Sequence, residues 1–379
     1  MQLLSTIKRA VDNPYKVKQY LRGQKSMFYY KYNEDGYADY PGTVYMVVNS
    51  ICNLKCKMCD VGQAQEDSQF WQNLIGPKME MPLDKLQKIV DEVKGFDPLI
   101  TFSSTEPTLW KNFIPAIRIV KKAGLRLKSA TNGLLLPKLA RQIVEEGLDH
   151  LFISVDGPQE AHNYIRGVPK SFEMIVEGIK KVQEAKKELG KTNPIIQINT
   201  TISEYNYDKI VATIDSLQGL GINEFTISHL NFVTEEMKSL HNQAWPQYLS
   251  THSCISSSES NKVNPEVLYE QLEEVKRKYK HLTLAFVPDM NLEELKTYYG
   301  SPLQILEKHN KCFVPWKVVQ ILSNGEVIPL TRCFHLVFGN VYTENFKDIW
   351  NNEKYRQFRK DLRRMEAFPG CARCCGIFN

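Results

Sequence analysis

The sequence predicts an α/β fold in which six strand–helix units form a partial (βα)6 TIM-like barrel, followed by a small C-terminal domain. Between residues 43 and 231, short apolar runs alternate with segments whose apolar residues recur at helical spacing. This alternation is typical of parallel strands joined by crossover helices, and right-handed crossovers curl such a sheet into a barrel. From Lys311 onward the pattern changes to a β-hairpin, a helix and a cluster of cysteines.

The barrel elements can be assigned in order along the chain. The strands are expected at 44–48, 99–102, 125–130, 151–155, 195–202 and 225–228. Helical spacing is clearest at 83–93, 114–122, 171–182 and 210–217. The first strand, Val44 to Val48, is a near-continuous apolar run, as a strand buried on both faces requires. Ser171 suits an N-cap, and Gly219 ends the last of these helices.

Two segments lie outside this alternation. Residues 1–42 are expected to form a leader, whose first part is a short basic amphipathic helix interrupted near Pro14. Such a helix can touch anionic lipid or pack across the bottom of the barrel, and its short apolar stripe favours packing. Residues 232–310 break the alternation, contain one helix at 265–279, and are expected to be an insertion or linker that contributes to the substrate pocket.

Composition restricts the function further. The net charge of +5 over 379 residues is too small to indicate a nucleic-acid partner, although it suits an anionic substrate or a membrane surface. The chain has no secretory pattern and no apolar run long enough to span a membrane, so we expect a cytoplasmic protein. In that compartment, cysteines clustered as they are here indicate metal or redox sites rather than disulfides.

The first cysteine cluster is Cys52, Cys56 and Cys59, with the spacing C-x3-C-x2-C directly after the first strand. Three thiolates on one loop can ligate three irons of a [4Fe–4S] cluster. The fourth iron then keeps an open position for a small molecule, as in catalytic metal sites. The alternative is a zinc site with a distant fourth ligand, but zinc sites generally present C-x2-C pairs.

This segment, with the apolar Met58 before its last cysteine, resembles the signature of the radical SAM superfamily. The resemblance implies that the fourth iron chelates the amino and carboxylate groups of S-adenosylmethionine. It implies that an electron from the cluster releases a 5′-deoxyadenosyl radical, which abstracts hydrogen from an unactivated carbon. It also implies an electron donor such as flavodoxin or ferredoxin, and it places Met58 in the cofactor site.

Two turns after later strands extend the resemblance. Ser104 to Pro107 resembles the family's Gly-Gly-Glu-Pro run with both glycines replaced, which implies that Glu106 contacts the methionine amino group. The alternative is that Glu106 only complements a helix dipole. Ala130 to Gly133 resembles the family's strand-three turn and adds Asn132 to the cofactor site, although Asn132 could be only a left-handed turn residue.

The fourth strand ends in Ser154-Val155-Asp156-Gly157, which resembles the family's strand-four motif. The resemblance implies that Ser154 faces the ribose. It also implies that Arg166 pairs with the methionine carboxylate, where an arginine can make two parallel bonds; the alternative is an arginine that closes a surface loop. Because these residues follow successive parallel strands, we expect them to meet the cysteine triad at one mouth of the barrel.

A second cysteine group occupies the predicted domain at 311–379. Its members are Cys312, Cys333, Cys371 and Cys374, with Cys375 adjacent. With the hairpin that turns at Asn324-Gly325, it resembles the SPASM or Twitch extension of radical SAM enzymes. Four thiolates would close an auxiliary [4Fe–4S] cluster and suit it to electron transfer. A zinc knob is the alternative, and whether Cys374 or Cys375 ligates stays open.

The resemblance predicts an oxidoreductase-type radical SAM enzyme that acts on a small polar substrate, sugar-like or phosphorylated, with the auxiliary cluster as electron acceptor. One alternative is a peptide maturase, but the leader before Thr43 is short for a winged-helix peptide-recognition domain. Another is an epimerase in which Cys254 donates a hydrogen atom; Cys254 would otherwise be a free thiol in a polar loop. A third is a zinc-stabilised binding protein without catalysis.

Overall fold

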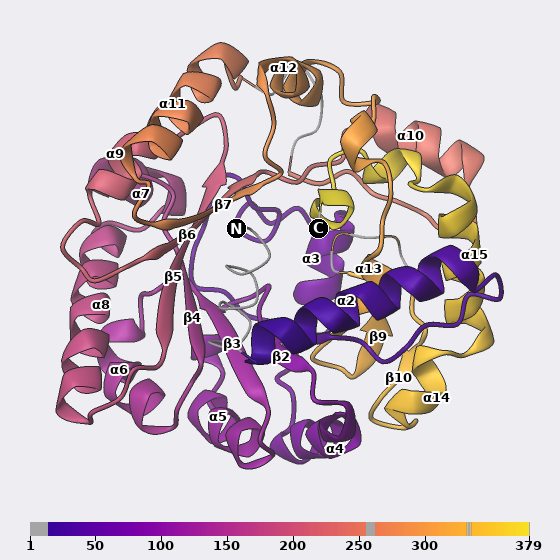
Figure 1. Cartoon of the computed structure of the whole chain (residues 1–379), viewed down its shortest axis with the longest axis horizontal. Coiled ribbons are helices and arrows are strands. Elements are labelled where there is room, and N and C mark those ends of the chain that lie inside the picture. The colour runs from indigo at the N-terminus through magenta and orange to yellow at the C-terminus, as the bar shows by residue number, and fades with distance from the viewer. Residues whose placement is uncertain (1–13, 255–261, 331, 333, 335, 379) are drawn as a thin grey trace, which may run out of the picture.

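A curved sheet organises the fold (Figure 1). The computed structural model describes residues 14–254, 262–330, 332, 334 and 336–378. Within them the sheet has ten strands in the order β10-β9-β8-β1-β2-β3-β4-β5-β6-β7. The strands from β8 to β7 pair in parallel, whereas β9 and β10 are antiparallel. The α/β class with a mainly parallel, barrel-like sheet is therefore confirmed.

The elements follow one another along the chain as expected for strand–helix units. The strands are β1 (Thr43–Met46), β2 (Leu99–Phe102), β3 (Arg126–Thr131), β4 (His150–Ser154), β5 (Ile195–Ile202), β6 (Glu224–His229), β7 (Thr283–Val287), β8 (Val318–Ile321), β9 (Glu326–Ile328) and β10 (Gly339–Asn340). The helices are α2 (Pro14–Tyr32), α3 (Gln69–Leu74), α4 (Leu83–Val93), α5 (Phe113–Lys122), α6 (Leu136–Glu145), α7 (Gln159–Arg166), α8 (Ser171–Glu188), α9 (Ile210–Asp215), α10 (Glu235–Ala244), α11 (Pro265–Lys278), α12 (Leu292–Gly300), α13 (Val314–Lys317), α14 (Phe346–Trp350) and α15 (Glu353–Met365). All six predicted barrel strands are present, while the sequence assigned no helix to α6 or α7.

Strand β5 shows how the sheet separates two environments. Ile196 and Ile198 are buried on one face, while Gln197 and Asn199 alternate with them and are partly exposed. Side chains alternate across a strand, so the apolar face packs against the outer helices (Figure 1) and the polar face lines the lumen. Polar side chains at the carboxyl ends of the strands are thereby held at the mouth.

Two regions differ from the expectation. The segment expected to break the alternation instead continues it, because α11 crosses over to β7, and β7 pairs in parallel with β6 (Glu224 with Thr283). Strand β7 is an edge strand with exposed positions, so its apolar run is weaker than those of the other strands. In the C-terminal region, β8 pairs in parallel with β1 (Thr43 with Val318), and the sheet runs without interruption across the boundary expected near residue 311.

Helix α2 crosses the open end of the barrel opposite the mouth (Figure 1). Arg22 donates to the carbonyls of Phe96 and Asp97, just before β2 begins. Tyr30 packs edge-on against Phe313 and Trp316. The helix expected before Pro14 lies outside the described residues. In the described part of the chain, no helix is long and apolar enough to cross a membrane.

Candidate active site

The first cysteine cluster lies on a loop at the carboxyl end of β1. Cys52 is exposed, Cys56 is buried and Cys59 is partly buried, and all three thiols are free. The loop folds back on itself at Gly62, where a Cβ would lie 2.5 Å from the backbone nitrogen of Cys56. Only glycine fits such a close approach without a shift of the backbone. The amide of Lys57 also donates to the carbonyl of Ile165, at 2.9 Å, which fixes the loop against α7.

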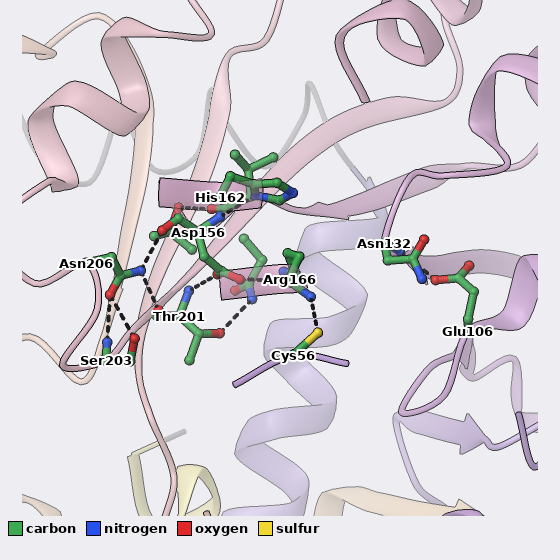
Figure 2. Close-up of polar contacts among 12 residues, drawn as sticks. Cys56, Glu106, Asn132, Asp156, His162, Arg166, Thr201, Ser203 and Asn206 are labelled. Carbon is green, nitrogen blue, oxygen red and sulfur yellow. Dashed lines mark hydrogen bonds and ion pairs between the residues drawn. The ribbon is translucent and has the colours of Figure 1, made fainter. Parts of the chain in front are cut away.

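Arg166 lies beside the cysteine loop (Figure 2). Its Nη1 donates to Sγ of Cys56 at 3.7 Å, and its Nη2 forms an ion pair with the fully buried Asp156. Burial raises the pKa of the Cys56 thiol, and the Arg166 guanidinium partly counteracts this shift. Nε of Arg166 is buried and has no hydrogen-bond partner among the described residues. Arg166 therefore contacts Cys56 as well as keeping one donor available, rather than closing a surface loop.

Asp156 is held by its own network (Figure 2). Its Oδ1 accepts a bond from the amide of Thr201 at 2.9 Å, and its carbonyl accepts one from Asn206 at 2.8 Å. Its amide donates to Nδ1 of His162 at 3.1 Å. Burial lowers the pKa of His162 to about 3, so the imidazole is neutral and can accept that bond. The turn after β4 is thereby fixed to β5, and Asp156 fixes Arg166.

Glu106 is fully buried in the loop after β2 and accepts four hydrogen bonds, of which Figure 2 shows the one from Asn132. The donors are Thr108 N at 3.2 Å, Thr108 Oγ1 at 2.5 Å, Thr131 Oγ1 at 2.8 Å and Asn132 N at 2.6 Å. Glu106 is the N-cap of a short 3-10 helix, Pro107–Leu109, and accepts a bond from the amide of Thr108 in that helix. The interpretation of Glu106 as a partner of a helix N-terminus is therefore correct in part. That interpretation does not explain the bonds from Thr131 and Asn132 at the end of β3. These bonds hold the carboxylate of Glu106 between the carboxyl ends of β2 and β3.

Asn132 connects this carboxylate to the cysteine loop. Its amide binds Glu106, and its Nδ2 donates to Oδ1 of Asn53 at 2.8 Å. The left-handed residue of the turn is Gly133, with φ of 83°. Ser104 adopts φ of 85°, a conformation that favours glycine. The loop thus keeps a glycine-like backbone at a position where the family carries glycine.

The remaining predicted cofactor residues lie at the same mouth. Ser154 ends β4 and is in register with Asn199 on β5, whose Oδ1 accepts a bond from Ser228 at 3.3 Å. Met58 is buried and lines a small cavity of about 60 Å³ together with Cys254. The roles of Ser154 and Met58 toward a cofactor stay predictions.

A buried polar cluster that the sequence did not reveal lies behind Cys59. Asp60 is fully buried and accepts bonds from Ser253 Oγ and from the amide of Cys254, both at 2.6 Å. Nη1 of Arg332 donates to Ser253 Oγ at 2.5 Å and to Cys254 Sγ at 2.9 Å, and lies 3.5 Å from Asp60. Burial of the thiol raises the pKa of Cys254 to about 12. This cluster joins the residue after Cys59 to the residue before the predicted ligand at 333.

The second cysteine group is described in part. Cys312 and Cys371 are buried, and Cys374 is partly buried. A Cβ at Gly376 would lie 3.5 Å from the sulfur of Cys374 and 3.6 Å from that of Cys312, so these two thiols converge. Cys333 lies outside the described residues, as does the side chain of Cys375, and the four-ligand set stays a prediction. Among the described residues no three His, Cys, Asp or Glu side chains gather as a site for a single metal ion.

Arg373 lies between Cys371 and Cys374 in the chain and holds this part of the second group in place. It is fully buried, and among the described residues its guanidinium donates hydrogen bonds only to backbone carbonyls. The acceptors are Thr297, Tyr298, Ser301, Gln304 and Ala372. Three of them lie at the end of α12, where the helix dipole favours a cation. Arg373 therefore fixes the turn between Cys371 and Cys374 to α12.

The donor set at the first loop fits an iron–sulfur cluster with bound S-adenosylmethionine. Three free thiols share one loop, a buried guanidinium with an unused donor lies beside Cys56, and the carboxylate of Glu106 reaches the loop through Asn132 and Asn53. A carboxylate and a guanidinium are the partners that the ammonium and carboxylate of a methionine moiety require.

Comparisons with known proteins agree with this chemistry. The radical SAM superfamily model matches residues 46–217, and the SPASM model, an iron–sulfur cluster-binding domain, matches residues 312–375. The tungsten-containing aldehyde ferredoxin oxidoreductase cofactor-modifying protein of Pyrococcus furiosus is 26% identical, over 87% of this chain and 86% of its own. An AdoMet-dependent heme synthase of Methanosarcina barkeri is 27% identical over 86% of this chain and 85% of its own.

Solved structures share the fold. Streptococcus suis SuiB bound to S-adenosylmethionine aligns over 94% of this chain and 77% of its own, with a TM-score of 0.61 and 16% identity. Native anSMEcpe with bound AdoMet aligns over 83% of this chain and 82% of its own, with a TM-score of 0.55 and 16% identity. Together the two family models cover more than half of the chain. The chain therefore belongs to the radical SAM superfamily, as an enzyme with a [4Fe–4S] cluster that binds S-adenosylmethionine and a C-terminal SPASM domain for auxiliary iron–sulfur binding.

Proposed function

We propose that this enzyme oxidises a small, polar, anionic substrate in a cavity between its two cysteine groups. When bound, the first cluster and S-adenosylmethionine would supply the radical that removes a hydrogen atom, and the auxiliary cluster would take up the electron that the substrate radical loses together with a proton. Cys52, Cys56 and Cys59 would hold the first cluster. Glu106 and Arg166 would orient the methionine moiety, in keeping with the family resemblance.

The observation that carries this proposal is a cavity of about 370 Å³. The residues that line this cavity include Ser104, which lies on the same loop as Glu106, and Cys374 of the second cysteine group. The size lies within the range of small-molecule sites. A substrate held there would lie between the residues of the first cofactor site and a predicted ligand of the auxiliary cluster, as a radical oxidation with an internal electron acceptor requires.

Lys317 gives the cavity its charge preference. It lines the cavity from the end of α13, directly before β8, and burial lowers its pKa. Arg332 also lines the cavity, but its charge is matched by the buried carboxylate of Asp60, 3.5 Å away. A carboxylate or phosphate on the substrate would provide Lys317 with an anionic partner and offset the cost of burying the ammonium group.

The relatives support a small organic substrate. Two proteins that match more than four-fifths of this chain are named for cofactor modification and for heme synthesis. A peptide substrate is the second candidate, because SuiB is described with its precursor peptide SuiA, although that likeness concerns the fold. Epimerisation is the third, since Cys254 lies beside Met58 in the smaller cavity.

Anaerobic reconstitution followed by product analysis tests these candidates. We expect about eight irons per chain for two cubic clusters, and release of 5′-deoxyadenosine on reduction. The holoenzyme is then incubated with the small-molecule and the peptide fraction of a cell extract. Oxidation predicts a small product that lacks two hydrogen atoms. A modified peptide would favour the maturase, and a product of unchanged composition that gains one deuterium in deuterated water would favour the epimerase, whose activity Cys254→Ser should abolish.

A further inference from the structure

Helix α2 carries an apolar stripe on its solvent side. Leu21, Phe28 and Tyr32 are 60%, 59% and 69% exposed. They are separated by seven and four residues, so they share one face of the helix. Six of the twelve exposed large hydrophobic side chains among the described residues fall between positions 20 and 40. Exposed apolar groups are therefore concentrated on this end of the molecule rather than scattered over its surface, and such a concentration indicates a contact surface.

Basic residues flank the stripe. Helix α2 contains five basic residues and no acidic one. Lys18 and Lys25 border the stripe on one side and Lys31 on the other, as helical spacing requires. Lys18 and Lys25 also pair with Asp97 and Asp39. These pairs are partly exposed and therefore weak, so lipid phosphates can replace the two carboxylates. The first 32 residues contain seven Lys or Arg and one Asp, so they carry more positive charge than the whole chain, whose net charge is +5.

We propose that α2 docks the enzyme on an anionic membrane surface. On a helix that is already packed on the barrel, an exposed apolar stripe bordered by lysines allows apolar side chains to enter the headgroup boundary while the lysines reach the lipid phosphates. Because α2 lies opposite the mouth, docking leaves the Glu106 end of the barrel facing away from the membrane. Substrates and the electron donor would then reach the site from the aqueous side.

Vesicle sedimentation of the reconstituted full-length enzyme tests this proposal. We expect binding to phosphatidylcholine vesicles that contain about a third phosphatidylglycerol, weaker binding to phosphatidylcholine alone, and loss of binding at high salt. The variant Leu21→Ser/Phe28→Ser/Tyr32→Ser should bind at least about tenfold more weakly, since it loses the apolar area that would be buried. Its release of 5′-deoxyadenosine should stay unchanged, which also reports that the variant folds.

A matched control removes apolar groups elsewhere. Leu249 and Leu303 are 52% and 48% exposed and lie outside α2, so Leu249→Ser/Leu303→Ser should bind vesicles like the wild type. Unchanged binding of the α2 variant would overturn the proposal, as would equal binding to neutral and anionic vesicles. The proposal would also be overturned if the enzyme bound double-stranded DNA more tightly than vesicles and the α2 substitutions did not change DNA binding. That result would show that the basic residues bind a nucleic acid.

Discussion

The two cysteine groups lie in different surroundings. Around the first, buried ions form pairs: Arg166 with Asp156 beside Cys56, and Arg332 with Asp60 behind Cys59. Around the second, Cys312 and Cys371 belong to the main apolar core. One nearby cation, Arg373, is held by backbone carbonyls, whereas Arg332, which precedes Cys333 in the chain, pairs with Asp60 on the first loop and so lies between the two groups.

This difference matches the chemistry of the two groups. Burying a charged side chain destabilises the fold unless the charge is paired. Buried ion pairs are therefore expected mainly where they contact a ligand or cofactor. The first group must orient a cofactor that carries an ammonium, a carboxylate and a sulfonium, and fixed charges provide that orientation. In the proposed function the second group would hold a closed electron-transfer cluster, which needs a dry shell and a fixed loop, and apolar packing and Arg373 would provide both.

Loss of a ligand from each group should give the largest and most distinct effects. Cys56→Ala should abolish reductive release of 5′-deoxyadenosine, because the first cluster loses its middle ligand. Cys312→Ala should keep that release but lose formation of the oxidised product. Each variant should retain about four irons, measured by iron counting and by electron paramagnetic resonance. Equal loss of 5′-deoxyadenosine in both variants would contradict the separation of roles.

Arg166→Met should produce the next largest effect. It leaves Asp156 buried without its counter-ion, and such a loss destabilises by about 3–5 kcal/mol. The double variant Arg166→Met/Asp156→Asn should recover part of that stability, because no charge is then left unpaired. Urea unfolding of the apoprotein measures both. Equal instability of the single and double variants would show that the guanidinium acts through packing alone.

Arg373→Met should be less damaging, at about 2–3 kcal/mol, since it leaves neutral carbonyls rather than a charge without a partner. The effect should also be local. Iron should fall toward the content of one cluster while 5′-deoxyadenosine release persists, because the turn between Cys371 and Cys374 loses its attachment to α12. Arg364→Met, at an exposed arginine of α15, is the matched control and should change neither quantity.

The sequence was most informative where functional residues share one loop or directly follow successive strands. Cys52 to Cys59 form one loop, and Glu106 and Asn132 each follow a strand, so barrel topology alone brings them together. Asp60 and Arg332 are 272 residues apart, and no local pattern links them. The role of Arg373 could not be predicted from the sequence for a different reason. Its partners are backbone carbonyls, and their positions depend on how α12 packs. Strand β7 was missed because it is an exposed edge.

Glu106→Gln should give the smallest effect and test the charged character of the first site most directly. The amide keeps the shape of the carboxylate and removes its charge, and with its oxygen toward Thr108 and Thr131 it loses only the bond from the Asn132 amide. We therefore expect S-adenosylmethionine to bind about tenfold more weakly, which is about 1.4 kcal/mol. Burial raises the pKa of Glu106. An ammonium group favours the ionised carboxylate, so wild-type affinity should increase as pH rises through that raised pKa, whereas the Gln variant should lack this increase. Isothermal titration of the reconstituted enzyme between acidic and neutral pH measures both. A wild type and a variant with the same pH dependence would show that Glu106 supports the loop through its bonds to Thr108 and Thr131 and not through its charge.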